Sequence, residues 1–163
     1  MPSWNDAPDV VAYSVSTSGV PSRVIWSASK DGALQPYVYA ALATDEKLEI
    51  GVRNVAGTRT EASSSGSMTT GVHSLIIEFD GTATLKAYLD TVEVASVAVS
   101  GSFTGLDHLN LGGLVGYLEG HPFDERIAEP VLHAGASFPG YSAIDRTRLH
   151  NWLAERVTGL VAV

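Results

Sequence analysis

Alternation of apolar and polar residues at every second position is the feature of this sequence that most restricts its fold. In residues 46–54 (EKLEIGVRN) the apolar side chains fall on one side of the chain and the charged ones on the other: Leu48, Ile50 and Val52 against Lys47, Glu49 and Arg53. A period of two belongs to extended chain, because successive side chains of a strand point to opposite faces of a sheet. The pattern therefore predicts half-buried strands.

Residues 72–90 predict an antiparallel hairpin. The runs VHSLIIEFD (72–80) and ATLKAYLD (83–90) both alternate, and Asp80-Gly81 stands between them. Asp-Gly is a strong signal for a short hairpin connection. Ile76 adds an apolar side chain on the second face of the first strand.

Five further stretches are expected to be strands, because β-branched, aromatic and other apolar residues stand there between turn residues: 10–16, 22–29, 35–43, 107–113 and 125–134. The small polar run ASSSGSMTTG (62–71) is interpreted as a loop inside the domain, too short for an interdomain linker.

Two irregularities are expected within the strands. In residues 92–100 the apolar face switches after Val94, which predicts a bulge near Ala95-Ser96. Pro130 cannot donate a ladder hydrogen bond, so its strand is expected to run along a sheet edge or to be bulged there.

One segment has the helical period instead. In SAIDRTRLHNWLAERV the apolar residues recur at roughly helical spacing, Ser142 can act as N-cap, and Asp145 suits the positive helix end. A helix at about 142–158 after nine or ten strands predicts an all-β domain with one terminal helix. A chain of 163 residues suits a single domain, residues 1–163.

Charge and composition argue against two classes of partner. Lys and Arg number 10 and Asp and Glu 18, which gives a formal charge of −8. Nucleic acid needs a dense basic surface, and anionic lipid repels an acidic one. We therefore expect no nucleic-acid partner and no membrane partner. Residues 1–9 show neither the basic start nor the apolar run of a secretory signal, so none is expected there. The absence of cysteine excludes thiolate metal sites and cysteine nucleophiles.

The ordered motifs of the second half resemble one known family. GVHSLIIEFDGTATLKAYLDTVEV (71–94) and LNLGGLVGYLEGHPFDERIAEPVLHAGA (109–136) are similar to the laminin-G-like, concanavalin A-like module, in which an aromatic-His precedes a strand, Asp-Gly follows, and the next strand ends in Tyr-x-Asp-Gly. The closing helix resembles that of many small bacterial and phage members. The sequence departs from the pattern at Val72, Thr91 and Glu125, where the family usually has an aromatic residue and two glycines.

The resemblance implies a two-sheet antiparallel jelly-roll sandwich with one C-terminal helix, which also suits the alternating faces. It also raises the question of catalysis, because related sandwiches include glycoside hydrolases. Retaining hydrolysis needs two carboxyl groups about 5 Å apart. Glu78-Phe79-Asp80 lacks the third acid of the related Glu-x-Asp-x-x-Glu motif, so Asp80 is expected as a turn residue and no residue is assigned as catalytic.

No cofactor and no metal ligand are assigned either. A single calcium ion held by loop carbonyls together with Asp80, Asp90 or Asp107 is left open, because calcium accepts scattered oxygen ligands. The five histidines show no metal-binding spacing. His73 matches the strand-opening histidine of the resembling family, which implies that it packs structurally, and His150, beside Arg148 on the helix, is expected to be exposed.

Two groups of residues are candidate contact sites for a ligand or a partner chain: Tyr37 and Tyr39 on one face of a strand, and Tyr117, His121 and Phe123 in the loop 113–123. Aromatic rings on a concave sheet can stack against sugar rings, and exposed loop aromatics are frequent contacts. The alternative for the tyrosines is packing under the helix or between the sheets, and for the loop it is ordinary packing.

Three functions compete. The main prediction is a non-catalytic virion surface or decoration protein of a phage capsid or tail, located in the virion and attached to other virion proteins, with self-association and host glycans as further partners left open. The alternative is a carbohydrate-binding module of a secreted bacterial protein. An enzyme is the least supported.

Overall fold

The computed structural model describes residues 8–15, 23–30, 35–69, 71–80, 83–112, 127–134 and 142–158. Within these ranges the chain forms ten strands and one helix: β1 (Pro8–Val15), β2 (Arg23–Ser29), β3 (Tyr37–Leu42), β4 (Lys47–Arg53), β5 (Arg59–Ser67), β6 (Val72–Phe79), β7 (Thr84–Leu89), β8 (Val92–Ala98), β9 (His108–Leu111), β10 (Ile127–Ala134) and α1 (Ala143–Thr158).

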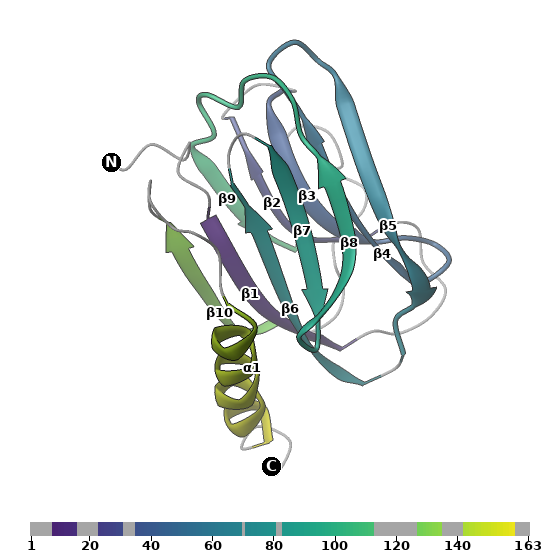
Figure 1. The fold of residues 1–163 in the computed structure, drawn as a ribbon, viewed down its shortest axis with the longest axis vertical. Coiled ribbons are helices and arrows are strands. Elements are labelled where there is room, and N and C mark those ends of the chain that lie inside the picture. The colour runs from purple at the N-terminus through teal and green to yellow at the C-terminus, as the bar shows by residue number, and fades with distance from the viewer. Residues whose placement is uncertain are drawn as a thin grey trace.

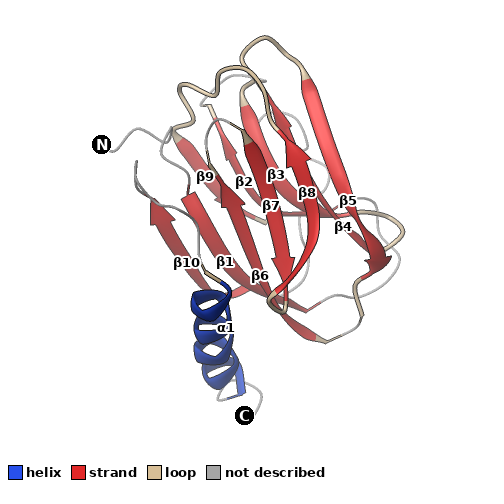
Figure 2. Cartoon of the chain, in the orientation of Figure 1, coloured by secondary structure: helices blue, strands red, loops and turns tan. Residues whose placement is uncertain are grey.

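The strands form two antiparallel sheets, which confirms the predicted sandwich. One has the order β10-β1-β6-β7-β8, and we call it the helix sheet because α1 contacts β6 and β10. The other has the order β5-β4-β3-β2-β9, and we call it the tyrosine sheet after Tyr37 and Tyr39 of β3. Figure 1 shows the two layers stacked, with α1 beside the end of the helix sheet. In Figure 2 the blue helix lies outside the red layers.

Alternate residues of the strands fill the space between the sheets. The tyrosine sheet and the helix sheet each contribute one apolar face to a common core: Val38, Ala40, Leu42, Leu48, Ile50 and Val52 from the first, and Leu75, Ile77, Phe79, Leu85 and Ala87 from the second. Phe79 meets Phe103 edge to face, with ring centroids 5.3 Å apart. The period-two pattern thus identified the core face of these strands, because burial on one side is what the alternation encodes.

The predicted hairpin is formed by β6 and β7, which pair in antiparallel register. Asp80 closes it as a turn residue, as expected. Its carboxylate accepts hydrogen bonds from the main-chain N–H groups of Ala83 (2.7 Å) and Thr84 (2.9 Å) and from the Thr84 hydroxyl (2.8 Å).

Both predicted irregularities are present. In β8 the register with β7 shifts between Ala87 and Tyr88, so that Val94 is the extra residue, one position before the expected bulge. β10 is an edge strand of the helix sheet, and its register with β1 shifts next to Pro130.

The prediction of a loop at residues 62–71 is wrong. Residues up to Ser67 continue β5, which pairs with β4 at the edge of the tyrosine sheet. Ala62 packs against the core, and the Ser64 hydroxyl accepts a hydrogen bond from the Leu48 N–H. Because an edge strand leaves most of its side chains exposed, its residues are polar and the alternation that marks other strands is missing.

The turn between β7 and β8 uses two non-glycine residues with positive φ, Asp90 at 49° and Thr91 at 76°. Aspartate tolerates this left-handed conformation, whereas a β-branched residue is strained in it by roughly 1–2 kcal/mol. Thr91 stands where the resembling family usually has glycine, so this chain carries strain that the family pattern avoids.

Ser142 caps α1, as predicted. The Asp145 N–H donates to the Ser142 hydroxyl at 3.2 Å, and that hydroxyl donates to the Asp145 carboxylate at 2.6 Å. The second hydrogen bond lowers the pKa of Asp145. Among the described residues, α1 is too short and too polar to cross a membrane, and no other helix is present.

Candidate functional site

Tyr37 and Tyr39 lie on the surface of the tyrosine sheet that faces away from the core, which we call the tyrosine face. Their neighbours Val38 and Ala40 point into the core. The tyrosines belong to a separate buried cluster: Val24, Tyr37, Tyr39 and Ala41. They therefore lie neither between the sheets nor under α1, which contacts the helix sheet.

Strand pairing arranges the residues of the tyrosine face in rows across five strands. The first row, from β9 to β5, is His108, Ser29, Tyr37, Arg53 and Arg59. The second row is Asn110, Ser27, Tyr39, Gly51 and Glu61. Directly opposed residues lie about 5 Å apart on one face, so each row brings together side chains from distant parts of the sequence.

The Tyr39 hydroxyl is the centre of a polar network on this face. It donates to Glu49 Oε1 at 2.5 Å and lies 3.0 Å from Glu61 Oε2. Arg59 Nη2 donates to the same hydroxyl at 3.1 Å and forms an ion pair with Glu61 at 2.6 Å. The network holds two carboxylates and one guanidinium around a single oxygen atom.

Gly51 makes this arrangement possible. The Tyr39 ring lies across β4, and a Cβ atom at Gly51 would come within 2.7 Å of the ring carbon Cζ and of the hydroxyl oxygen. Real side chains do not approach so closely, so a side chain at this position would have to displace the ring. The glycine thus lets Tyr39 reach from β3 over β4 to Glu61 on β5.

The charged side chains around the Tyr39 hydroxyl are more exposed than the two tyrosines. The residues Tyr37 and Tyr39 are 4% and 3% exposed, whereas the side chains of Glu49, Arg59 and Glu61 are 24%, 49% and 45% exposed. Burial, together with the hydrogen bond to Glu49, raises the pKa of Tyr39 above its ordinary value, and the bond to Tyr39 raises the pKa of the Arg59 guanidinium. The accessible groups of the site are therefore charged side chains, not an open aromatic platform.

Sequence reasoning found part of this site. Tyr37 and Tyr39 are brought together, with ring centroids 6.0 Å apart. Tyr117, His121 and Phe123 lie outside the described residues, so their assignment stays a prediction. Arg59 and Glu61 were missed, because β5 carries no alternation that would have placed them beside β4.

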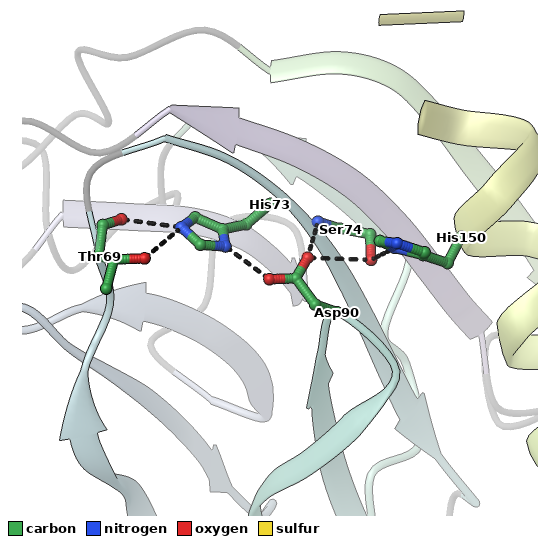
Figure 3. Close-up of polar contacts among 5 residues, drawn as sticks. All are labelled: Thr69, His73, Ser74, Asp90 and His150. Carbon is green, nitrogen blue, oxygen red and sulfur yellow. Dashed lines mark hydrogen bonds and ion pairs between the residues drawn. The ribbon is translucent and has the colours of Figure 1, made fainter. Parts of the chain in front are cut away.

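A second polar cluster lies at the other end of the hairpin, on the helix sheet (Figure 3). His73 Nδ1 donates to Asp90 Oδ2 at 2.7 Å, and His73 Nε2 lies 2.8 Å from the Thr69 carbonyl oxygen. The second carboxylate oxygen of Asp90 accepts from the Ser74 N–H at 2.9 Å, and the Ser74 hydroxyl lies 2.6 Å from His150 Nδ1. We call these five residues the buried chain after its two buried members, His73 and Ser74, although the Asp90 side chain is 39% exposed. It joins the start of β6, the β7–β8 turn and α1.

The buried chain contains serine, histidine and aspartate, but its geometry argues against a nucleophile. Ser74 is 0% exposed, so a substrate cannot reach its hydroxyl. The histidine beside Ser74 is His150, whereas Asp90 orients a different one, His73. A catalytic triad needs one histidine to contact both partners. His150 was expected to be exposed; it is half-buried instead, and its contact with Ser74 helps to dock α1.

Arg146 also docks α1 on the helix sheet. Its Nη1 donates to Glu78 Oε1 at 3.2 Å, and its guanidinium lies over the Tyr88 ring, 4.0 Å from the centroid. The side chains of Arg146 and Glu78 are 16% and 14% exposed. With Asp80 bound in its turn and Glu78 paired, neither carboxylate is placed as a glycosidase acid.

The described aspartates that could have held calcium are engaged within the protein. Asp80 and Asp90 bind main-chain N–H groups, and Asp107 lies 2.9 Å from His108 Nδ1. In the part of the chain that the structure describes, no group of three His, Asp or Glu side chains could hold a metal ion.

Stability is expected to fall as the pH rises above 10. Burial, with a contribution from Glu78, raises the pKa of Tyr88 to about 12. An unfolded tyrosine loses its proton near pH 10, so between pH 10 and 12 the folded state binds more protons. Unfolding then becomes easier by up to about 1.4 kcal/mol per pH unit for this group.

Urea denaturation at pH 9, 10 and 11 measures this slope. Tyr88→Phe keeps the ring under Arg146 but removes the titrating hydroxyl, so it should flatten the decline. An identical slope in the wild type and the variant would contradict the assignment.

No protein-family profile and no curated protein sequence matches the chain. Its fold, however, is similar to those of several solved structures. Domains LG4-5 of the mouse laminin alpha1 chain are 21% identical, with a TM-score of 0.61 over 79% of this chain and 36% of that one. The Ruminococcus gnavus IT-sialidase CBM40 bound to alpha2,3 sialyllactose is 13% identical, with a TM-score of 0.63 over 89% and 83%. The binding domain of botulinum neurotoxin serotype D/C is 10% identical, with a TM-score of 0.61 over 93% and 37%.

These likenesses establish the concanavalin A-like sandwich fold. At such low identity they establish the fold alone. This chain spans little more than a third of the laminin and neurotoxin structures and most of the CBM40 structure. The phage or bacterial origin implied by the sequence resemblance stays a prediction.

Proposed function

We propose that this chain is a non-catalytic glycan-binding module whose contact surface is the tyrosine face. The observation that carries the proposal is the Tyr39 network. Sugar hydroxyls both donate and accept hydrogen bonds. Glu49 and Glu61 supply acceptors and Arg59 supplies donors, and each of the three side chains has an exposed part.

Preorganisation supports the proposal. The hydrogen bonds of the Tyr39 hydroxyl to all three charged groups hold the tyrosine in position, and the absence of a side chain at Gly51 leaves room for its ring. Groups that are already ordered lose less conformational entropy when a ligand binds. The likeness to a carbohydrate-binding module solved with a sialylated sugar lends the proposal further support.

The compared structures favour a carbohydrate-binding module over a virion decoration protein, which was the main prediction from the sequence. Attachment to virion proteins, self-association and a location in the virion or outside the cell stay predictions. Sedimentation with purified virions would check the first: a protein that stays in the soluble fraction would contradict it.

A glycan array with matched variants tests the proposal. Glu61→Gln should weaken glycan binding about tenfold or more, because hydrogen bonds to a charged group are stronger than neutral ones. Glu93→Gln is the matched control: its side chain is 43% exposed against 45% for Glu61, it also has a cationic partner, and it lies on β8 of the helix sheet. Equal effects of the two variants, or no binding of any glycan by the wild type, would overturn the proposal.

A further inference from the structure

Arg53 differs from the other charged side chains of the tyrosine face. Arg59 forms ion pairs with Glu61 at 2.6 Å and with Glu49 at 3.9 Å. Arg53 donates from Nε to the Gly57 carbonyl at 3.1 Å, and no described carboxylate lies within 4 Å of its guanidinium. The bond to Gly57 restrains the guanidinium and leaves its terminal N–H groups for another acceptor.

One neighbour of Arg53 in the first row is a second cation. Arg59 lies directly opposite on β5, and like charges opposed across two strands repel. On the other side, Tyr37 separates Arg53 from Ser29. The Ser29 hydroxyl has no hydrogen-bond partner among the described residues, but the residue is 1% exposed, so a ligand cannot reach it. An incoming anion at Arg53 therefore relieves the repulsion between the two guanidinium groups, and this is the feature that favours an anionic ligand.

From these contacts we infer that the glycan bound at the tyrosine face carries an anionic substituent, a carboxylate or a sulfate, which Arg53 receives. The inference rests on the function proposed above and specifies its ligand class. A guanidinium offers two parallel N–H donors that match two oxygen atoms of either group. The Tyr39 network beside Arg53 then contacts the neutral hydroxyls of the same glycan.

Matched sugars and charge-matched variants test the inference. An array of glycans in neutral, carboxylated and sulfated forms, with lactose, 3′-sialyllactose and 3′-sulfolactose as one set, should show at least about tenfold preference for an acidic form. Whether the carboxylated or the sulfated form binds more tightly identifies the preferred anionic group. Arg53→Gln should remove that preference and leave the weaker binding of neutral forms in place, and Arg53→Lys should restore only part of it.

Arg148→Gln is the control for the loss of one positive charge, since Arg148 is 78% exposed on α1, which contacts the other sheet. Near-UV circular dichroism of each variant excludes unfolding as the cause. Binding of neutral and acidic forms with equal affinity, or a preference that survives Arg53→Gln, overturns the inference and leaves the proposed glycan binding standing. Failure to bind any glycan overturns both.

Discussion

Replacing Arg146 with alanine is expected to lower the free energy of unfolding by about 3 kcal/mol. The largely buried guanidinium bridges α1 to Glu78 and to the Tyr88 ring. Its removal takes the cationic partner from a carboxylate that is 14% exposed, and a buried charge that loses its partner is destabilising. The contact with the ring is lost as well.

Arg148→Ala provides the matched control from the same helix. Its side chain is 78% exposed and lies 3.9 Å from Asp145, so its removal should cost less than about 0.5 kcal/mol. Urea denaturation followed by far-UV circular dichroism measures both variants. A double-mutant cycle of Arg146→Ala with Glu78→Gln measures the interaction between these two side chains, because their effects on the free energy of unfolding should not be additive. Equal losses for Arg146 and Arg148 would show that Arg146 does not dock the helix.

Asp90→Ala is expected to cost about 3 kcal/mol through the buried chain and the turn together. The substitution removes the acceptor of the buried His73 ring and of the Ser74 N–H, and each buried donor left without a partner costs about 1–3 kcal/mol. It also places alanine at a φ of 49°, which aspartate tolerates better.

Two neighbouring substitutions separate these causes. Asp90→Asn tolerates the turn conformation and keeps one acceptor oxygen, so it should cost about half as much. Thr91→Gly removes the strain at a φ of 76° without touching the buried chain, and should raise stability by up to about 1 kcal/mol. Thermal and urea unfolding check the order of the three variants. A destabilised Thr91→Gly would mean that the turn is not strained.

The sandwich was predictable from the sequence where local signals repeat. Strand β4 alternates cleanly, Asp80 closes a short hairpin, and Ser142 begins the helix, because burial on one face, turn geometry and capping each demand particular residues within a few positions. β5 escaped prediction because an exposed edge strand needs few apolar residues.

The candidate site was predictable only in part, for a related reason. Periodicity placed Tyr37 and Tyr39 together on one side of β3, but it could not tell whether that side faced the core, the helix or the outer surface. His150 was expected to be exposed because it lies on the helix beside Arg148, whereas its partner Ser74 stands 76 positions earlier in the chain.

The sequence by itself determined which residues share a face, where strands turn and where the helix starts, since these depend on neighbours a few positions away. Only the tertiary structure decided which face of β3, a strand that is apolar on both sides, joined the core, and which charges meet. Rows such as Tyr37, Arg53 and Arg59 are assembled by pairing across strands. The residues of such a row come from separate strands. Their contacts depend on which strands pair and in which register, and this cannot be predicted from neighbours along the sequence.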